Sequence, residues 1–151
     1  MRNYLLASGM TLMLFSTPAL QAKAPSSAAQ KAIVTTIESA LRAAATENTR
    51  GFEDEVASGF YMYDNGRRFD AQSIMALIKQ VHASGTKLEW HVTEPDVHIS
   101  GKTAWIAYVN QGSVTKDGAV AEKKWLESAF LVRTHEGWKI AFWHSSAAAA
   151  E

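Results

Sequence analysis

Residues 103–134 read TAWIAYVNQGSVTKDGAVAEKKWLESAFLVRT, and this stretch decides the fold. The segment Lys116–Ala119 has the composition of a tight hairpin turn, and the long runs on both sides are rich in aromatic and β-branched residues, as strands are. A two-residue turn at its centre fixes every later pair and sets Tyr108 opposite Glu127. The sequence therefore predicts a long antiparallel hairpin.

Both faces of this hairpin are apolar, although a sheet with one face in water carries polar residues on that face. The first face carries Ile106, Tyr108, Asn110, Trp125, Glu127, Ala129 and Leu131. The second carries Trp105, Ala107, Val109, Leu126, Ser128, Phe130 and Val132. We expect the first face to line the core and a pocket, and the second to be covered by another copy of the chain. The reverse assignment, with the second face under the helices and the Glu127 face pairing, is the alternative.

The last predicted strand covers residues 138–145, and two registers are open for it. With a three-residue loop at 135–137, Ser145 lies on the Glu127 face and His144 lies on the other face. With a two-residue loop the strand flips and His144 joins Glu127. We favour the first register, because the second would force a positive φ on a glutamate.

Upstream of the hairpin, the spacing of apolar residues predicts helices over about 27–46 and 52–57, and a third helix that Asp70 caps and Ser84-Gly85 ends. The expected strands before the hairpin are residues 60–63, 67–69, 88–93 and 97–99. Asp64-Asn65-Gly66 and Glu94-Pro95-Asp96 are interpreted as turns. Helices followed by antiparallel strands predict the α+β class.

The N-terminus has the pattern of a secretory signal peptide over residues 1–22, with cleavage after Ala22. Arg2 supplies a positive charge and residues 5–15 are mostly apolar, a run shorter than the roughly 20 residues that span a bilayer. An uncleaved membrane anchor is the alternative. We expect a bacterial periplasmic or secreted protein without a stable membrane anchor, with one domain over 23–146 and a frayed tail over 147–151.

The composition excludes several classes of function. The chain has 151 residues, 15 basic and 15 acidic side chains, and no cysteine. Without cysteine there is no disulfide scaffold, no zinc–thiolate site and no thiol nucleophile. The zero net charge gives no electrostatic case for binding nucleic acid.

Four segments carry a family likeness: Glu94–Gly101, Ala104–Val109, Trp125–Ser128 and Gly137–Ser146. Together with the order of elements over residues 27–146, they resemble the nuclear transport factor 2-like superfamily, which includes SnoaL-like cyclases and ketosteroid isomerases. The motifs are closest to the association domain of calmodulin-dependent kinase II and its bacterial relatives. The resemblance implies a cone-shaped, curved antiparallel sheet wrapped around N-terminal helices, a fold that hosts both enzymes and binding domains.

The resemblance also bears on the pocket. In the kinase association domains, pocket arginines fall at positions that match Asn110, Ala129 and Ser145. None of the three is arginine here, which argues against the same anion-binding chemistry.

Glu127 is the strongest candidate for a catalytic residue. A carboxylate among aromatic side chains has a raised pKa and can act as a general base, with Tyr108 as a hydrogen-bond donor to a substrate oxygen. A purely structural glutamate is the alternative. His91 and His98 lack a standard metal-ligand spacing, so no metal is expected. The general-base chemistry would need no cofactor, and none is expected. The candidate ligand-binding residues are Tyr108, Asn110, Trp125, Glu127, Ala129, Trp143, His144 and Ser145.

Three functions remain open from the sequence. The first is binding of a small, largely apolar ligand in the cone cavity. The second is a cofactor-free isomerase, cyclase or dehydratase with Glu127 as base, and the third is an assembly or protein-interaction module. A homodimer is expected in each case, through the face that carries Trp105, Val109, Leu126, Phe130 and Val132.

Overall fold

The computed structural model of the chain describes residues 27–149. The elements in order are α1 (Ser27–Ala45), α2 (Thr49–Glu55), β1 (Val56–Asp64), β2 (Arg67–Phe69), α3 (Ala71–Ala83), β3 (Lys87–Ser100), β4 (Thr103–Lys116), β5 (Ala119–Arg133) and β6 (Trp138–Ala147). The signal peptide expected over 1–22 lies outside the described residues. No helix within 27–149 is long and apolar enough to cross a membrane.

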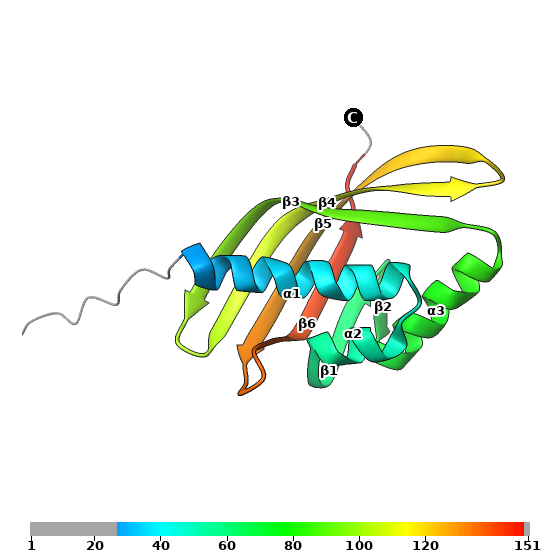
Figure 1. Ribbon diagram of the computed structural model, residues 1–151. Helices are drawn as coiled ribbons and strands as arrows, with labels where there is room; N and C mark the ends of the chain where they lie inside the picture. The colour runs from blue at the N-terminus through cyan, green and yellow to red at the C-terminus, as the bar shows by residue number, and fades with distance from the viewer. Residues whose placement is uncertain (1–26, 150–151) are drawn as a thin grey trace, which may run out of the picture.

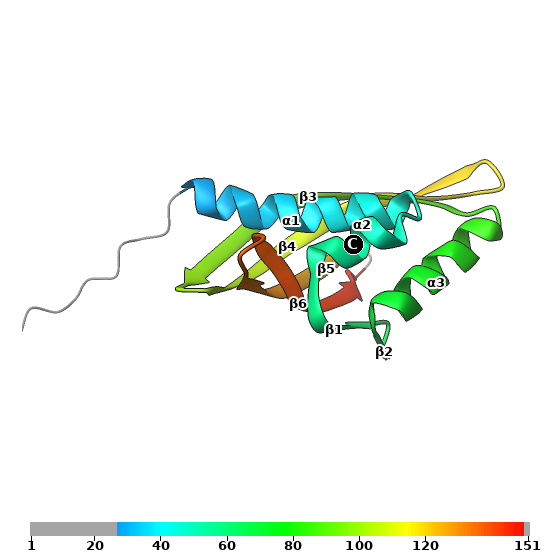
Figure 2. The same ribbon diagram turned by 60° about the horizontal axis from the view of Figure 1, so that its bottom comes forward.

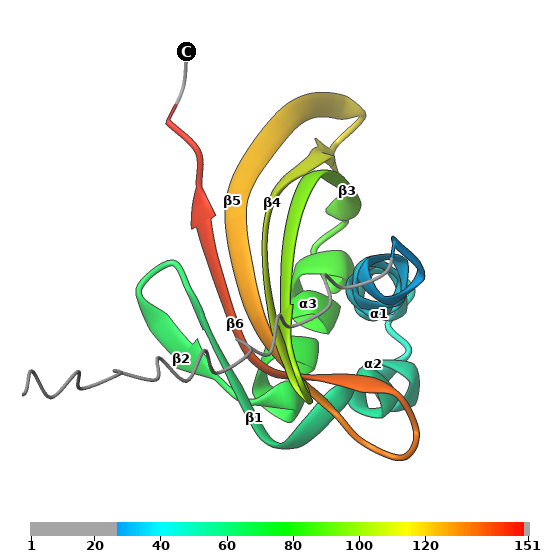
Figure 3. The ribbon, with the colours of Figure 1, turned by 90° about the vertical axis from the view of Figure 1, so that its left-hand side faces the viewer.

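The six strands form one sheet in the order β2-β1-β6-β5-β4-β3. Neighbouring strands are antiparallel except β1 and β6, which are parallel. The sheet is curled and the helices lie on one side of it (Figures 1 and 3). Helix α1 runs along the sheet, and α3 lies beside β2 near the start of β3 (Figure 2). The expected α+β fold, a curved sheet around N-terminal helices, is confirmed.

We call the side of the sheet that the helices cover the inner face, and the opposite side the outer face. The core lies on the inner face. Ile33 and Ile37 of α1 are fully buried, as are Ile106, Leu131 and Ile140 of the sheet. Burial of such side chains supplies most of the stability of a domain of this size, and it fixes which side of each strand faces the helices.

Helix α3 begins as the sequence predicts. The Asp70 carboxylate accepts a hydrogen bond from the backbone N–H of Ser73 at 2.8 Å, and the Ser73 hydroxyl accepts one from the backbone N–H of Asp70 at 2.9 Å. This reciprocal cap satisfies two backbone donors that have no partner within the helix. The helix ends at Ala83, Ser84 forms its C-cap, and Gly85 follows with φ 82°.

The predicted hairpin is confirmed residue by residue. Tyr108 lies opposite Glu127, and Asn110 lies opposite Trp125. The two turn residues, Asp117 and Gly118, both have positive φ, at 51° and 81°, as the turn type that matches the twist of antiparallel strands requires.

The predicted break after Thr93 is wrong. β3 is one strand from Lys87 to Ser100, and Glu94-Pro95 forms a β-bulge in it, with the register shifting between Thr93 and Asp96. Glu94 has φ 52°. Proline has no N–H for the ladder and is accepted at bulges and edge strands, so a segment that resembles a turn is part of a strand.

The last loop is one residue longer than predicted, since Trp138 pairs with Arg133. A bulge at Ala141 then compensates, because the register shifts between Leu131 and Phe130. After the bulge, Ser145 lies opposite Glu127, as the favoured register predicted. The bulge turns Trp138 and Ile140 inward before it and Trp143 and Ser145 inward after it.

The other element boundaries differ by a few residues. α2 begins before the predicted residue 52, and β1 begins four residues before the predicted strand at 60. β6 continues to Ala147, beyond the predicted end at 145, and the backbone N–H of Ala148 donates to the carbonyl of Lys124. These additions lengthen the sheet without changing which residues face the helices.

Candidate functional site

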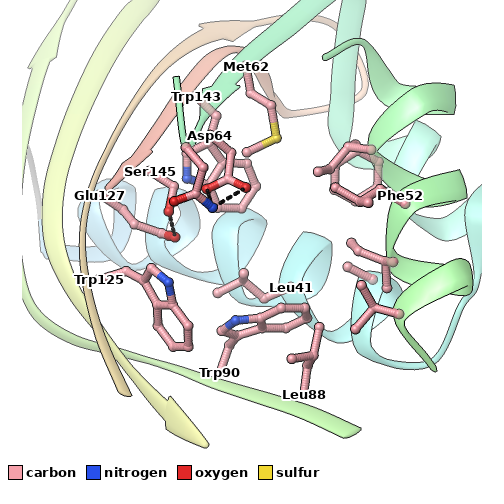
Figure 4. Close-up of a pocket in the computed structure, with 16 residues that line it drawn as sticks. Leu41, Phe52, Met62, Asp64, Leu88, Trp90, Trp125, Glu127, Trp143 and Ser145 are labelled. Carbon is pink, nitrogen blue, oxygen red and sulfur yellow. Dashed lines mark hydrogen bonds between the residues drawn. The ribbon is translucent and has the colours of Figure 1, made fainter. Parts of the chain in front are cut away.

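A cavity of about 290 Å³ lies between the inner face of the sheet and the helices. Most of its wall is apolar, with side chains such as Leu41 of α1 and Leu77 of α3. Three strands each contribute an indole: Trp90 from β3, Trp125 from β5 and Trp143 from β6. Figure 4 shows Trp90 and Trp125 side by side at one end of the cavity and polar side chains gathered at the other.

The polar end is built by one transverse row of residues across four adjacent strands. Asp64 of β1 lies opposite Ser145 of β6, Ser145 lies opposite Glu127 of β5, and Glu127 lies opposite Tyr108 of β4. Directly opposed residues of neighbouring strands share a face and have Cβ atoms about 5 Å apart. The sheet order thus brings together four polar residues that are distant in the sequence.

Glu127 is buried in this row between Ser145 and Tyr108. Tyr108 Oη donates a hydrogen bond to Glu127 Oε2, and Ser145 Oγ donates one to Glu127 Oε1 at 2.8 Å. Burial raises the pKa of Glu127, and the hydroxyl donors partly oppose that rise. Burial and the Glu127 charge together raise the pKa of Tyr108 well above its ordinary range, so the phenol remains a donor.

Two further donors stand near this carboxylate. Asn110 and Trp143 both favour the charged form of Glu127, yet Asn110 Nδ2 and Trp143 Nε1 are buried without a hydrogen-bond partner. Asn110 is oriented by its other atom, since Oδ1 accepts a hydrogen bond from the backbone N–H of His91 at 3.1 Å. An unpaired buried donor is costly, so the Trp143 N–H at the cavity wall is a position where a ligand acceptor would be stabilised.

Asp64 is a cavity residue that the sequence interpretation missed. Its carboxylate oxygens accept from Asn65 Nδ2 at 3.2 and 3.3 Å. Burial raises the pKa of Asp64, while the Asn65 hydrogen bond and the nearby His144 lower it. The period of two from Phe60 through Met62 would have placed Asp64 on the inner face. The parallel pairing of β1 with β6, which brings it to Glu127, has no local sequence signal.

The eight predicted ligand-binding residues divide into three groups. Four line the cavity: Trp125, Glu127, Trp143 and Ser145. Tyr108, Asn110 and Ala129 are buried on the same face without lining the cavity. His144 is exposed on the outer face, opposite Tyr63 and Ser128, because the strand register turns it away from the helices. His144 therefore does not line this cavity.

No other histidine of the described residues lines this cavity. Within residues 27–149 there is no group of three or more histidine, aspartate or glutamate side chains that could hold a metal ion. His98 Nε2 lies 2.8 Å from Asp96 Oδ1, and its ring stacks on Trp105 with centroids 3.9 Å apart. These contacts place His98 on the outer face.

The outer face carries large apolar side chains that are exposed to solvent. Trp105, Leu126 and Phe130 are 46%, 54% and 41% exposed, and Val109 and Val132 are partly buried beside them. Trp105 lies opposite Phe130, and Phe130 opposite Phe142, so aromatic rings form a row across the strands. No helix of the described chain covers this face (Figure 3).

Comparison with known proteins agrees with the fold. The family model of the SnoaL-like domain matches residues 33–150, and no curated protein matches the sequence. A nuclear transport factor 2-like protein with a cystatin-like fold from Novosphingobium aromaticivorans is 14% identical, with a TM-score of 0.70 over 82% of this chain and 84% of its own.

Two other solved structures are similar. The association domain of calmodulin-dependent kinase II from C. elegans is 17% identical, with a TM-score of 0.66 over 79% of this chain and 95% of its own. A ketosteroid isomerase-like protein from Erwinia carotovora atroseptica is 16% identical, with a TM-score of 0.64 over 80% and 97%. Identities this low show a shared fold alone.

Proposed function

This chain belongs to the SnoaL-like domain family, and from its cavity we propose that it binds a small, largely apolar molecule with one polar group. The polar group would lie at the row formed by Asp64, Ser145 and Glu127, and the apolar body would lie against Trp90 and Trp125. The observation that carries this proposal is the cavity itself, apolar along most of its wall and polar at one end.

The dimensions and chemistry of the cavity support this proposal. Ligand sites are concave, mostly apolar and equipped with a few polar groups that fix orientation, with volumes of about 300–1,000 Å³. A cavity of about 290 Å³ lies at the small end of that range. The ligand is therefore expected to have one or two rings.

A thermal-shift screen tests the binding proposal. A panel of one- and two-ring alcohols, ketones, amines and carboxylic acids is tested against the protein and against Ala44→Leu, which adds side-chain volume to the cavity wall. Val120→Leu, on the exposed tip of the β4–β5 hairpin, is the matched control. The proposal expects a hit that Ala44→Leu weakens at least tenfold and Val120→Leu leaves unchanged. A folded protein with no hit in any class overturns it.

The second candidate is cofactor-free proton transfer at a carbon next to a carbonyl group, with Asp64 as the base. Both Glu127 oxygens already accept hydrogen bonds from hydroxyl groups, whereas Asp64 accepts only from Asn65 among the described residues. Asp64 would remove the proton, and the enolate oxygen would accept from Trp143 Nε1. Return of the same proton to another carbon completes an isomerisation.

Deuterium exchange into 2-tetralone, followed by NMR in D₂O, tests the second candidate. General bases contribute roughly 10²–10⁴-fold, so Asp64→Asn should lower the catalysed exchange at least a hundredfold. Asp117→Asn, in the distant hairpin turn, should leave it unchanged. No exchange above the buffer rate, or full exchange by Asp64→Asn, removes this candidate.

We also propose that two copies pair through the outer face, centred on Trp105, Leu126 and Phe130. Exposed apolar patches beyond a few hundred Å² are unusual on monomers. A two-fold contact uses the same patch on both copies. Burial of this face in a dimer would leave the cavity on the opposite, helix-covered side of the sheet.

Secretion is proposed from the N-terminal sequence. Residues 1–22 have the charged start, the short apolar run and the small residue before the cleavage point that signal peptides share. Mass spectrometry of the periplasmic or secreted fraction should give a chain that begins at Lys23. A chain that retains Met1 in the membrane fraction would contradict the proposal.

A further inference from the structure

The ionisable side chains that line the cavity are all acidic. Its lining includes two carboxylic acids, Asp64 and Glu127, and no lysine, arginine or histidine. A carboxylate that faces an apolar cavity without a cationic partner is costly in free energy. A ligand that carries positive charge would remove part of that cost.

Neighbouring arginines do not neutralise Asp64. Arg67 lies opposite Asp64 in the β1–β2 hairpin, but it is exposed and its guanidinium lies over the Phe69 ring, 5.0 Å from the centroid. Arg68 lies over Tyr61 in the same way, at 4.5 Å. Neither forms an ion pair with Asp64 among the described residues. His144 on the outer face lowers the pKa of Asp64 but forms no ion pair with it among the described residues, so the carboxylate remains open to a ligand.

The aromatic wall also favours a cation. Indole faces attract ammonium groups, by about 0.5–2 kcal/mol depending on desolvation, and of the three cavity tryptophans Trp143 lies at the polar end, where the ammonium group would bind. Trp143 is only 3% exposed, and its Nε1 has no hydrogen-bond partner. That N–H is a donor at the polar end of the cavity, so it would pair with an acceptor atom and not with the ammonium group itself.

We propose that the ligand is a small hydrophobic amine, bound as its cation with the ammonium group between Asp64 and Glu127. Ser145 lies between these two acids in the row, so its hydroxyl is also within the reach of such a group. The apolar body extends along Trp90 and Trp125 (Figure 4). This inference rests on the proposed binding function and names the chemical class of its ligand.

Three probes of one shape separate the possibilities: 3-phenylpropylamine, 3-phenylpropan-1-ol and 3-phenylpropionate. Their affinities are measured at pH 7 by isothermal titration calorimetry. The amine should bind at least tenfold more tightly than the alcohol, and the carboxylate should bind most weakly. Asp64→Asn should bring the affinities for amine and alcohol within about twofold of each other, and Asp117→Asn should preserve the preference.

The outcomes distinguish failure of the amine inference from failure of the proposed binding function. If the unmodified protein binds the alcohol or the carboxylate as tightly as the amine or more tightly, the amine inference is wrong, but the cavity is still a small-molecule site. Binding of none of the three overturns both. The comparison of probes on the unmodified protein is decisive even if Asp64→Asn does not fold, and Glu127→Gln offers a second test of the same charge.

Discussion

Tyr108 on β4 lies directly opposite Glu127 on β5 and donates its hydroxyl hydrogen bond to that carboxylate, with both side chains buried. The pair joins the sheet core to the polar end of the cavity, because Glu127 also accepts from Ser145. A buried carboxylate is tolerated only when its oxygens are paired. Glu127 is thus part of the hydrogen-bonded sheet core and also part of the cavity wall.

Removal of the phenol hydroxyl should destabilise the protein. Tyr108→Phe leaves one Glu127 oxygen without its donor, which costs about 1–3 kcal/mol for a buried polar group. Urea unfolding at pH 7 measures the loss. Tyr63→Phe, at an exposed tyrosine of β1, is the control and should change the free energy of unfolding by less than about 0.5 kcal/mol. Equal stabilities of the two variants would show that the buried bond contributes nothing.

The raised pKa of Glu127 predicts a specific pH dependence of stability. Since the folded state holds the proton more tightly than the unfolded state, this group's contribution is present below its ordinary pKa of about 4.3. It is lost as pH rises through the raised pKa. The free energy of unfolding, measured from pH 4 to 8, should fall more with rising pH than in Glu127→Gln. Parallel curves would contradict a raised pKa.

The outer face should control the oligomeric state. Phe130→Glu places a charge in the centre of the proposed contact and should convert a dimer into a monomer at micromolar concentration, as light scattering measures. Val120→Glu adds the same charge at the exposed hairpin tip and should leave the dimer intact. A monomeric parent protein, or a dimeric Phe130→Glu variant, would refute pairing through this face.

The bulge in β3 predicts an unusual substitution pattern. Glu94 has φ 52°, a conformation that costs non-glycine residues roughly 1–2 kcal/mol. Glu94→Gly should therefore be neutral or stabilising in thermal unfolding, although glycine usually weakens strands. Glu94→Val should destabilise, while Glu122→Val in regular β5 should not. Destabilisation by Glu94→Gly would argue that the bulge is not strained.

The sequence predicts the hairpin and its pairs because one turn, Lys116–Ala119, sets the register of everything that follows it. It does not predict the site of Asp64, because the parallel contact between β1 and β6 is made by segments more than 70 residues apart with no turn between them. The β-bulges escape prediction for a related reason. Glu94-Pro95 has the composition of a turn, and only the pairing with β4 keeps β3 continuous across it.

The indole N–H signals of the five tryptophans test the central claim directly. Three tryptophans line the cavity, Trp105 lies on the outer face, and Trp138 is buried away from the cavity. In a ¹⁵N NMR titration with 3-phenylpropylamine, repeated with 3-phenylpropan-1-ol, the account predicts saturable shifts of Trp90, Trp125 and Trp143 while Trp105 stays in place. Saturable shifts confined to Trp105, or no saturable shift with either probe, would contradict a ligand site inside the cone.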